Sequence, residues 1–275
     1  MIRGVLLYEE TDAKKNQWFI GHLIETAKDQ GIDLSFMIYR KELFIGDNKE
    51  LIRMDFCINR TRYSYVNVFL EARNVRCYNN LSTVKIANDK WLTYLMCKEL
   101  EIPVMDTIPF DKNSFKDIEF PVVIKSKNGH GGNEVFWVNN EEELQNIEFE
   151  NENGYIVQKP ASVPGVDVRV YVLGDCPIIG VKRSSASDFR SNFSLGGQVE
   201  IFSPTAGQLA MIKKIQKFLA TDYVGVDFML HNDTWILNEI EDVVGARMLY
   251  SLSDYDIAEA FIKYICRDLK NVKGR

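Results

Sequence analysis

Several features are scarce in this sequence of 275 residues, and each shortage excludes a class of protein. No stretch approaches the roughly 18 consecutive apolar residues that a membrane-spanning helix needs. The amino-terminal apolar run ends at Glu9 and Glu10, which is too early for a secretory signal and is typical of a strand. With 7 prolines, 17 glycines and 46% hydrophobic residues, the chain is neither disordered nor collagen-like. We therefore expect a soluble cytoplasmic protein with a sizeable core.

Cysteine, histidine and excess positive charge are scarce as well. The 5 cysteines form no Cys-x-x-Cys pair and the 3 histidines are isolated, which argues against a structural zinc site and favours free thiols in a reducing compartment. The 33 basic residues are outnumbered by 39 acidic ones, giving a net charge of −6. The chain thus lacks the overall charge of a nucleic-acid-binding protein, although a local basic pocket stays possible.

The first 80 residues alternate between short apolar runs and amphipathic stretches, which favours a small parallel α/β layer. Strands are expected at residues 4–8, 34–39, 54–58 and 75–78, and helices at residues 16–30 and 65–73. A polar break at residues 79–83 precedes a helix over residues 88–100, which we expect Asn88 to cap. The apolar face of that helix would consist of Trp91, Tyr94, Leu95 and Leu100.

From residue 120 onward the pattern changes to hairpins, with no internal repeat and no flexible Gly/Ser linker. Strands are expected at residues 121–125, 134–138, 155–158, 167–173, 177–182, 223–230 and 235–241, and helices at residues 208–219 and 256–269. The domains must therefore pack tightly on one another.

A glycine-rich loop follows Lys125, and its glycines at 129, 131 and 132 let backbone N–H groups approach a ligand closely. It is not a Walker A loop, because no Gly-Lys-[Ser/Thr] leads into a helix. It is not a dinucleotide-binding fingerprint either, because a strand follows it. The pattern indicates a hairpin flap that covers polyphosphate or an ordinary hairpin turn.

Three carboxylates, Asp227, Glu239 and Glu241, lie on the expected hairpin at 223–241. A three-residue loop at 231–233 would put Asp227 opposite Leu237, with Glu239 on the neighbouring diagonal, so that the three acids converge. Oxygen ligands suit Mg²⁺ or Mn²⁺ rather than zinc. The alternative is a solvent-exposed strand face.

Two further segments are rich in polar groups. Asp167, Arg169 and Tyr171 share one face of a strand that is either solvated or lines a cleft. Residues 182–197 concentrate cations, hydroxyls and glycines, as in an anion-handling loop or a mobile surface loop. Two lysines, a glycine flap, several carboxylates and an arginine together suit phosphoryl transfer from ATP, which depends on positioning and charge neutralisation.

The order of these motifs resembles the ATP-grasp superfamily and, within it, the RimK-like carboxylate–amine ligases. The resemblance extends from near Asn79 to about Arg247. It rests on Asn88-Asp89-Lys90 with Ile102-Pro103-Val104, Phe120 to Lys125 with its glycine loop, Tyr155 to Gln158, Asp167-Val168-Arg169, Phe189-Arg190-Ser191-Asn192 with Gly196-Gly197, Gly225-Val226-Asp227, and Asn238-Glu239-Ile240-Glu241.

The resemblance implies an α/β protein with an ATP-grasp fold. A small parallel α/β pre-grasp domain would occupy residues 1–82. Two α+β domains would grip ATP: residues 83–158, with the glycine flap, and residues 159–275, with the metal site. A homo-oligomer is possible.

The resemblance also assigns roles. ATP would be bound by Lys90, Lys125, Gly129, Gly131, Gly132, Gln158, Lys159, Ala161 and Asp167. The catalytic residues would be Arg169, together with Arg190 and Asn192, which would hold the transferred phosphoryl group or an oxyanion. Mg²⁺ or Mn²⁺ would be held by Asp227, Glu239 and Glu241. Arg60, otherwise a helix-cap or surface arginine, would meet the substrate acid, and Lys182 and Arg183 would be further substrate-binding positions.

The chain departs from the family pattern in three places. Glu241 stands where asparagine is usual, and Lys159-Pro160 stands where a glutamate usually follows Gln158. Because proline has no N–H, a neighbour such as Ala161 must read the adenine edge. The residues after Glu241 lack the usual small-Pro-Gly turn, a difference that concerns the acceptor substrate more than the ATP chemistry.

The implied activity is ATP-dependent ligation. ATP would phosphorylate a carboxylate, and an amine, from an amino acid or a peptide, would attack the acyl phosphate to form an amide. Neither nucleic acid nor membrane is expected as a partner. Two alternatives stay open: a kinase for a small hydroxyl compound, and a nucleotide-binding protein without turnover. Retention of both lysines, the arginine and all three acids favours the ligase.

Overall fold

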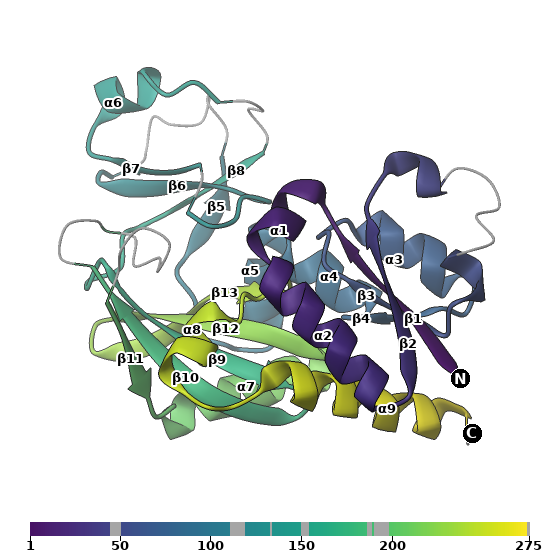
Figure 1. The fold of residues 1–275 in the computed structure, drawn as a ribbon. Coiled ribbons are helices and arrows are strands. Elements are labelled where there is room, and N and C mark those ends of the chain that lie inside the picture. The colour runs from purple at the N-terminus through teal and green to yellow at the C-terminus, as the bar shows by residue number, and fades with distance from the viewer. Residues whose placement is uncertain are drawn as a thin grey trace.

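Three β-sheets organise the computed structural model, which describes residues 1–44, 51–110, 119–132, 134–149, 154–185, 189 and 198–273. In Figure 1 the central sheet stands above the other two, which lie side by side. Parallel and antiparallel sheets combined with helices confirm the predicted α/β class. The predicted domain boundaries at residues 82 and 158 stay a prediction.

The N-terminal sheet is parallel throughout, with strand order β2-β1-β3-β4. Alternate residues of its central strand β1 face opposite sides: Leu6 and Tyr8 pack under helices α2 and α9, whereas Val5 and Leu7 pack against α3. Both faces are therefore covered, as a parallel sheet requires. The elements are β1 Ile2–Tyr8, α1 Glu10–Lys15, α2 Gln17–Asp29, β2 Ile32–Ile38, the 3₁₀ turns Lys41–Phe44 and Leu51–Arg53, β3 Phe56–Asn59, α3 Ser64–Glu71 and β4 Arg76–Tyr78.

The central sheet is antiparallel, with strand order β5-β8-β6-β7, and has an apolar core of its own. Its elements are β5 Thr107–Pro109, β6 Val122–Ser126, β7 Val135–Val138, α6 Glu141–Gln145 and β8 Tyr155–Gln158. The glycine loop, residues 127–132, connects β6 to β7.

The C-terminal sheet is antiparallel, with strand order β11-β10-β9-β12-β13. The alternating valines of β9 pack with α5 and α7, whereas Tyr171 and Leu173 on the other face join the core that contains α9 and the N-terminal sheet. One core thus runs from the N-terminal sheet into the C-terminal sheet. The elements are β9 Val166–Leu173, β10 Cys176–Ser184, β11 Gln198–Phe202, α7 Ala206–Leu219, β12 Tyr223–His231, β13 Thr234–Glu241, α8 Arg247–Leu252 and α9 Ile257–Lys273.

Two short helices, α4 Leu81–Ala87 and α5 Lys90–Glu99, connect the sheets and correct three predictions. The segment expected as a polar break begins α4, and Asp89 rather than Asn88 caps α5 by accepting the N–H groups of Trp91 and Leu92 at 2.9 and 3.1 Å. The buried face of α5 consists of Thr93, Met96 and Cys97. The predicted apolar face is correct only in part: Leu100 is half-buried against the core of the C-terminal sheet, whereas Leu95 is 44% exposed because the helix turns its other side toward that sheet.

The β12–β13 hairpin also differs from its predicted register. Its loop is the two-residue turn Asn232-Asp233, with φ of 47° and 59°, because two left-handed residues match the twist of a hairpin. An irregularity between Asp227 and Phe228 then brings Asp227 opposite Glu239 rather than Leu237. Glu241 lies opposite Gly225.

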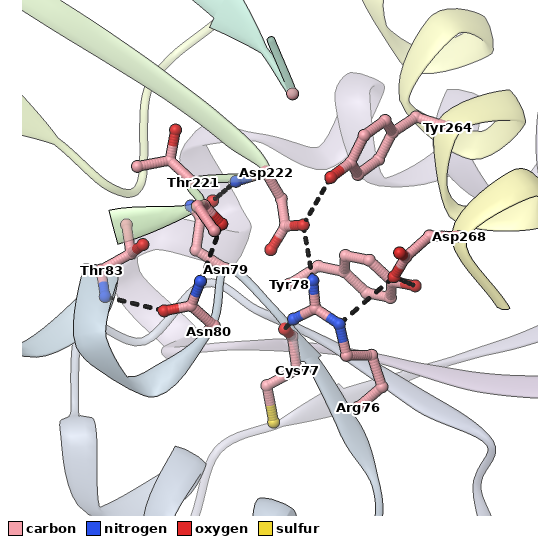
Figure 2. Close-up of polar contacts among 12 residues, drawn as sticks. Arg76, Cys77, Tyr78, Asn79, Asn80, Thr83, Thr221, Asp222, Tyr264 and Asp268 are labelled. Carbon is pink, nitrogen blue, oxygen red and sulfur yellow. Dashed lines mark hydrogen bonds and ion pairs between the residues drawn. The ribbon is translucent and has the colours of Figure 1, made fainter. Parts of the chain in front are cut away.

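Polar contacts join the N-terminal sheet to the C-terminal sheet (Figure 2). Arg76 of β4 donates to Asp222 at 2.7 Å and to Asp268 of α9 at 3.3 Å, and Tyr264 also donates to Asp222 at 2.9 Å. The Asn79 carboxamide receives the N–H groups of Asp222 and Tyr223 at 2.7 and 2.9 Å. These contacts hold the end of β4 beside the start of β12.

Candidate active site

A pocket lies between the central sheet, α5 and the C-terminal sheet. We call it the larger pocket, because a smaller one adjoins it. The structure brings together on its wall every residue that was predicted to bind the nucleotide: Lys90, Lys125, Gly129, Gly131, Gly132, Gln158, Lys159, Ala161 and Asp167. Their role in binding ATP stays a prediction, but segments that lie far apart in the chain form one site.

Two lysines form the cationic end of the larger pocket. The Lys125 ammonium donates to the Asn238 carboxamide at 3.2 Å, and Lys90 donates to the carbonyl of Gly129 and lies 3.8 Å from a Glu239 oxygen. Burial lowers the pKa of Lys125 to about 8, with Glu239 opposing this shift and Lys90 adding to it. Two ammonium groups held together in a partly buried site favour a polyanionic ligand.

The glycine loop is attached to the start of α5. Lys90 donates its backbone N–H to the Lys127 carbonyl at 2.9 Å, and the Asn128 carboxamide donates to the Asn88 carbonyl at 2.7 Å. Gly131 and Gly132 have φ of 67° and 80°, a conformation that glycine adopts without strain. The loop thus lies over the cationic end of the pocket, and its glycines allow the backbone conformation that it adopts there.

Apolar side chains that the sequence did not reveal as functional form the opposite end of the larger pocket. Trp137 of β7 and Phe189 lie with ring centroids 5.4 Å apart, and Met229 of β12 lines the same region. The two ring planes are inclined by 60°, so this aromatic wall offers a planar base the face of one ring and the edge of the other. Alternation along β7 was a usable signal, because Val135 and Trp137 line the pocket while Val138 enters the core.

The segment that leads from β8 of the central sheet to β9 of the C-terminal sheet borders the larger pocket. Gln158, which is 7% exposed, donates to the Thr107 hydroxyl at 2.8 Å. The Lys159 ammonium turns toward Glu119, donating to its carbonyl at 2.7 Å and to its carboxylate at 3.1 Å. The backbone of this segment, including Ala161, is therefore placed beside the pocket while the Lys159 charge is partly neutralised.

A buried network of charges occupies the polar face of β9. Arg169 donates to both oxygens of Asp227 at 2.7 Å, and Arg183 donates to Asp167 at 2.5 and 2.6 Å and to Asp227 at 2.7 Å. Glu241 forms an ion pair with Arg169. Burial favours the neutral acid, but Arg169 and Arg183 outweigh it and lower the pKa of Asp227 to about 2. This face is thus buried rather than solvated, and its residue Asp167 lines the larger pocket.

The predicted three-carboxylate metal site differs from the structure. The Asp227 side chain is fully buried and serves the two arginines, whereas the side chains of Glu239 and Glu241 are 34% and 23% exposed. Across the part of the chain that the structure describes, no three histidine, cysteine, aspartate or glutamate side chains are arranged to hold one metal ion. Of the three predicted ligands, Glu239 and Glu241 are the ones with partly exposed side chains, and Glu241 is also paired with Arg169.

A second, smaller pocket continues from the cationic end of the larger one toward the N-terminal sheet. The two share Lys90, Gly129, His130, Gly131 and Glu239. The smaller pocket is also lined by Arg62, Asn88, Asn128 and Glu241.

The predicted substrate-binding residues lie elsewhere. Arg60 is 6% exposed and donates to the Val244 carbonyl at 2.7 Å, so that it is neither a surface residue nor part of the described lining of either pocket. Lys182 pairs with Glu200 on the adjacent strand at 2.9 Å, and Arg183 belongs to the buried network. Arg190 and Asn192 lie outside the described residues.

Two solved structures align with this chain over nearly its whole length. D-alanine–D-alanine ligase from Bacillus anthracis, complexed with ATP, aligns with a TM-score of 0.73 at 15% identity, covering 100% of this chain and 99% of that chain. A RimK domain ATP-grasp protein from Sphaerobacter thermophilus aligns with a TM-score of 0.71 at 17% identity, covering 96% and 99%. The chain therefore has an ATP-grasp fold.

The sequence comparisons identify the family. The model of the RimK-like ATP-grasp domain matches residues 88–265, which is more than half of the chain, and the protein thus belongs to the RimK-like ATP-grasp family. The uncharacterised protein MG011 of Mycoplasma genitalium is 31% identical over 279 residues, covering 98% of this chain and 94% of the relative. The alpha-aminoadipate–LysW ligase LysX of Sulfurisphaera tokodaii is 23% identical over 270 residues, covering 90% and 94%.

The structure also bears on the membrane. None of the described helices combines the length and the apolar character that crossing a bilayer requires.

Proposed function

We propose that this protein uses ATP to join a carboxylate to an amine through an acyl phosphate, releasing ADP and phosphate. The observation that carries the proposal is the convergence of Lys90, Lys125, the glycine loop and Glu239 on one pocket. Family membership supports it, because the relatives include the alpha-aminoadipate–LysW ligase LysX and a probable alpha-L-glutamate ligase of Haemophilus ducreyi.

In the proposed reaction a substrate carboxylate oxygen attacks the terminal phosphorus of ATP, and the bond between that phosphorus and ADP breaks. The amine then attacks the acyl carbon, the C–N bond forms, phosphate leaves, and the amine loses a proton. Lys90 and Lys125 would hold the phosphates, and the glycine loop would cover them and exclude water. Gln158, Ala161 and the aromatic wall would hold the base.

Two carboxylates fit a divalent cation beside the phosphates. Glu239 and Glu241 are partly exposed and both line the smaller pocket, and oxygen ligands of this kind suit Mg²⁺ or Mn²⁺. When bound, the ion would neutralise phosphate charge. Asp227 would support this site from behind through Arg169, which contacts both Asp227 and Glu241.

Hydroxylamine tests the proposal without knowledge of the amine substrate, because it traps an acyl phosphate as a stable hydroxamate. The protein is incubated with ATP, Mg²⁺, hydroxylamine and, in turn, free amino acids, small dicarboxylic acids and short peptides. We expect one class of acid to yield hydroxamate and ADP in equal amounts, and Lys125→Ala, which should bind ATP more weakly, to yield much less of both. Phosphate transfer to a hydroxyl compound with no hydroxamate from any acid would favour a kinase instead.

A further inference from the structure

The parallel N-terminal sheet has a topological switch point beside the smaller pocket. From the central strand β1 the chain moves to β2 on one side and then crosses to β3 on the other, which gives the order β2-β1-β3-β4. Ligands of open parallel sheets bind in the crevice outside the carboxyl ends of the strands at such a point. Here the two segments that border the crevice are the one after β1, which contains Asp12, and the one after β3, which contains Arg62.

The segment after β3 is held rigidly by buried polar side chains. The Asn59 carboxamide oxygen accepts the backbone N–H of Thr61 at 3.0 Å and its hydroxyl at 2.8 Å, and the Asn59 amide donates to Asn67 at 2.8 Å. Asn59 and Thr61 are each 2% exposed, and Asn67 is 0% exposed. Such a network leaves the following residue little freedom.

That residue, Arg62, has a φ of 63°, in the left-handed region that residues with a Cβ seldom adopt. Strain of this kind persists only where the surroundings impose it, and it gathers at functional sites. Its guanidinium donates to the Asp12 carboxylate at 2.7 Å, and the two side chains are 19% and 18% exposed. The ion pair joins the two segments of the crevice and fixes the direction of the guanidinium.

Arg62 lines the smaller pocket together with residues that we assign to the phosphates and the metal ion. Glu239 and Glu241 line the same pocket, as do Lys90 of α5 and, from the glycine loop, His130. Burial, together with the neighbouring Arg62 charge, lowers the pKa of His130, so that a neutral imidazole rather than a second cation lies near the guanidinium. Arg60, two residues earlier, is instead tied to the Val244 carbonyl.

We propose that Arg62 binds the carboxylate of the acid substrate in the smaller pocket, next to the phosphates held by Lys90. A guanidinium presents N–H groups in a planar fork that matches a carboxylate. The two pockets share Lys90, His130 and Glu239 among their lining residues, so a carboxylate held in the smaller one would lie next to phosphates held in the larger one. This inference rests on the proposed function for the identity of the reaction but concerns binding, which can be measured separately.

Titration calorimetry with a non-hydrolysable ATP analogue and Mg²⁺ present tests the inference on free amino acids, small dicarboxylic acids and short peptides. We expect a carboxylate from one of these classes to bind wild type, with its affinity reduced about 10- to 100-fold in Arg62→Ala. Arg62→Gly should behave alike while accepting the φ of 63° without strain. Arg62→Lys should fall in between, because an ammonium lacks the planar fork. The class that binds tells a free acid from a peptide end.

Arg73→Ala is the matched control, since Arg73 is an exposed arginine on the same domain and stacks on Phe69. It should leave carboxylate binding unchanged, and none of the variants should change the affinity for the ATP analogue. Equal carboxylate affinity in wild type, Arg62→Ala and Arg62→Gly would overturn the inference, as would a wild type that binds no carboxylate of the panel. Binding that depends on Arg62, without hydroxamate from any acid, would retain the inference and reject the proposed ligase.

Discussion

Asp227 and Glu239 lie directly opposite each other on β12 and β13, yet their carboxylates meet different surroundings. The Asp227 side chain is 0% exposed between Arg169 and Arg183, whereas the Glu239 side chain is 34% exposed and lines both pockets. The two paired residues thus have different roles: Asp227 neutralises buried cations, and Glu239 is accessible to a ligand.

This division predicts opposite consequences for two conservative changes. Asp227→Asn should lower the free energy of unfolding by on the order of 3–5 kcal/mol, because it leaves two buried arginines without their counter-charge. Glu239→Gln should change stability little but weaken the binding of Mn²⁺ in the presence of an ATP analogue. Urea denaturation measures the first effect, and the electron paramagnetic resonance of free Mn²⁺ measures the second. A stable Asp227→Asn protein that has lost Mn²⁺ would instead assign Asp227 to the metal.

Lys125 makes ATP affinity depend on pH. Its pKa of about 8 means that the ammonium loses its proton, and with it its attraction for phosphate, as the pH rises through that value. Wild-type affinity should therefore decline above about pH 8, and Lys125→Ala should bind ATP more weakly by about 1.5–3 kcal/mol with a flatter profile. Lys98→Ala, which removes an ammonium that is 58% exposed on α5, is the control. Calorimetric titrations at several pH values would show whether the two profiles instead run in parallel.

The glycine loop should become ordered when nucleotide binds. Gly131 and Gly132 allow the free loop many conformations, and bound phosphates would supply further acceptors for its backbone N–H groups. Hydrogen exchange of residues 127–132 should slow when a non-hydrolysable ATP analogue and Mg²⁺ are added. The amides of β8, in the same sheet, serve as the internal reference. Equal exchange with and without the analogue would identify a static turn.

Asp222 should make folding stability fall with rising pH. Burial raises its pKa from 3.8 to about 7 despite the opposing Arg76. A carboxyl group that holds its proton more tightly in the folded than in the unfolded state contributes stability at low pH, and this contribution is lost as the pH rises between those two values. The melting temperature of wild type should thus drop more between about pH 5 and about pH 8 than that of Asp222→Asn. A larger drop in the variant would show that the ion pair with Arg76 dominates.

Local patterns predicted much of the secondary structure. The alternating valines at 168, 170 and 172 identified β9, and the expected strand at 155–158 is β8 without change. Which elements pack against one another was harder to predict from the sequence. The polar residues 79–83 resembled a loop, but Asn80 caps α4 by accepting the Thr83 N–H at 2.9 Å, and the rest of that helix packs on its neighbours. Which face of α5 is buried depended on a sheet formed from residues far along the chain.

The site residues that lie in recognisable motifs could be predicted from the sequence. Those whose position depends on backbone conformation could not. The residues expected around the nucleotide line one pocket, because the glycine loop and both lysines lie in recognisable motifs. The partner of Asp227, by contrast, depends on the backbone of Asn232 and Asp233, and one residue of register reverses which side chains face one another. Arg60 and Arg62 follow the same strand, and only the fold shows that the first is buried and the second lines a pocket.

The core shared by the N-terminal and C-terminal sheets has a kinetic consequence. Arg60 holds the Val244 carbonyl and Tyr171 holds the Gly245 carbonyl, so the turn after β13 is fastened to both sheets, which must move as one body. The central sheet has a separate core, and we expect it to pivot near Gln158, where the chain leaves β8 toward β9. Nucleotide exchange should then proceed by tilting of the central sheet alone, while Arg62 and Glu239 keep their separation. An acid already seated between them could await a fresh ATP without being released.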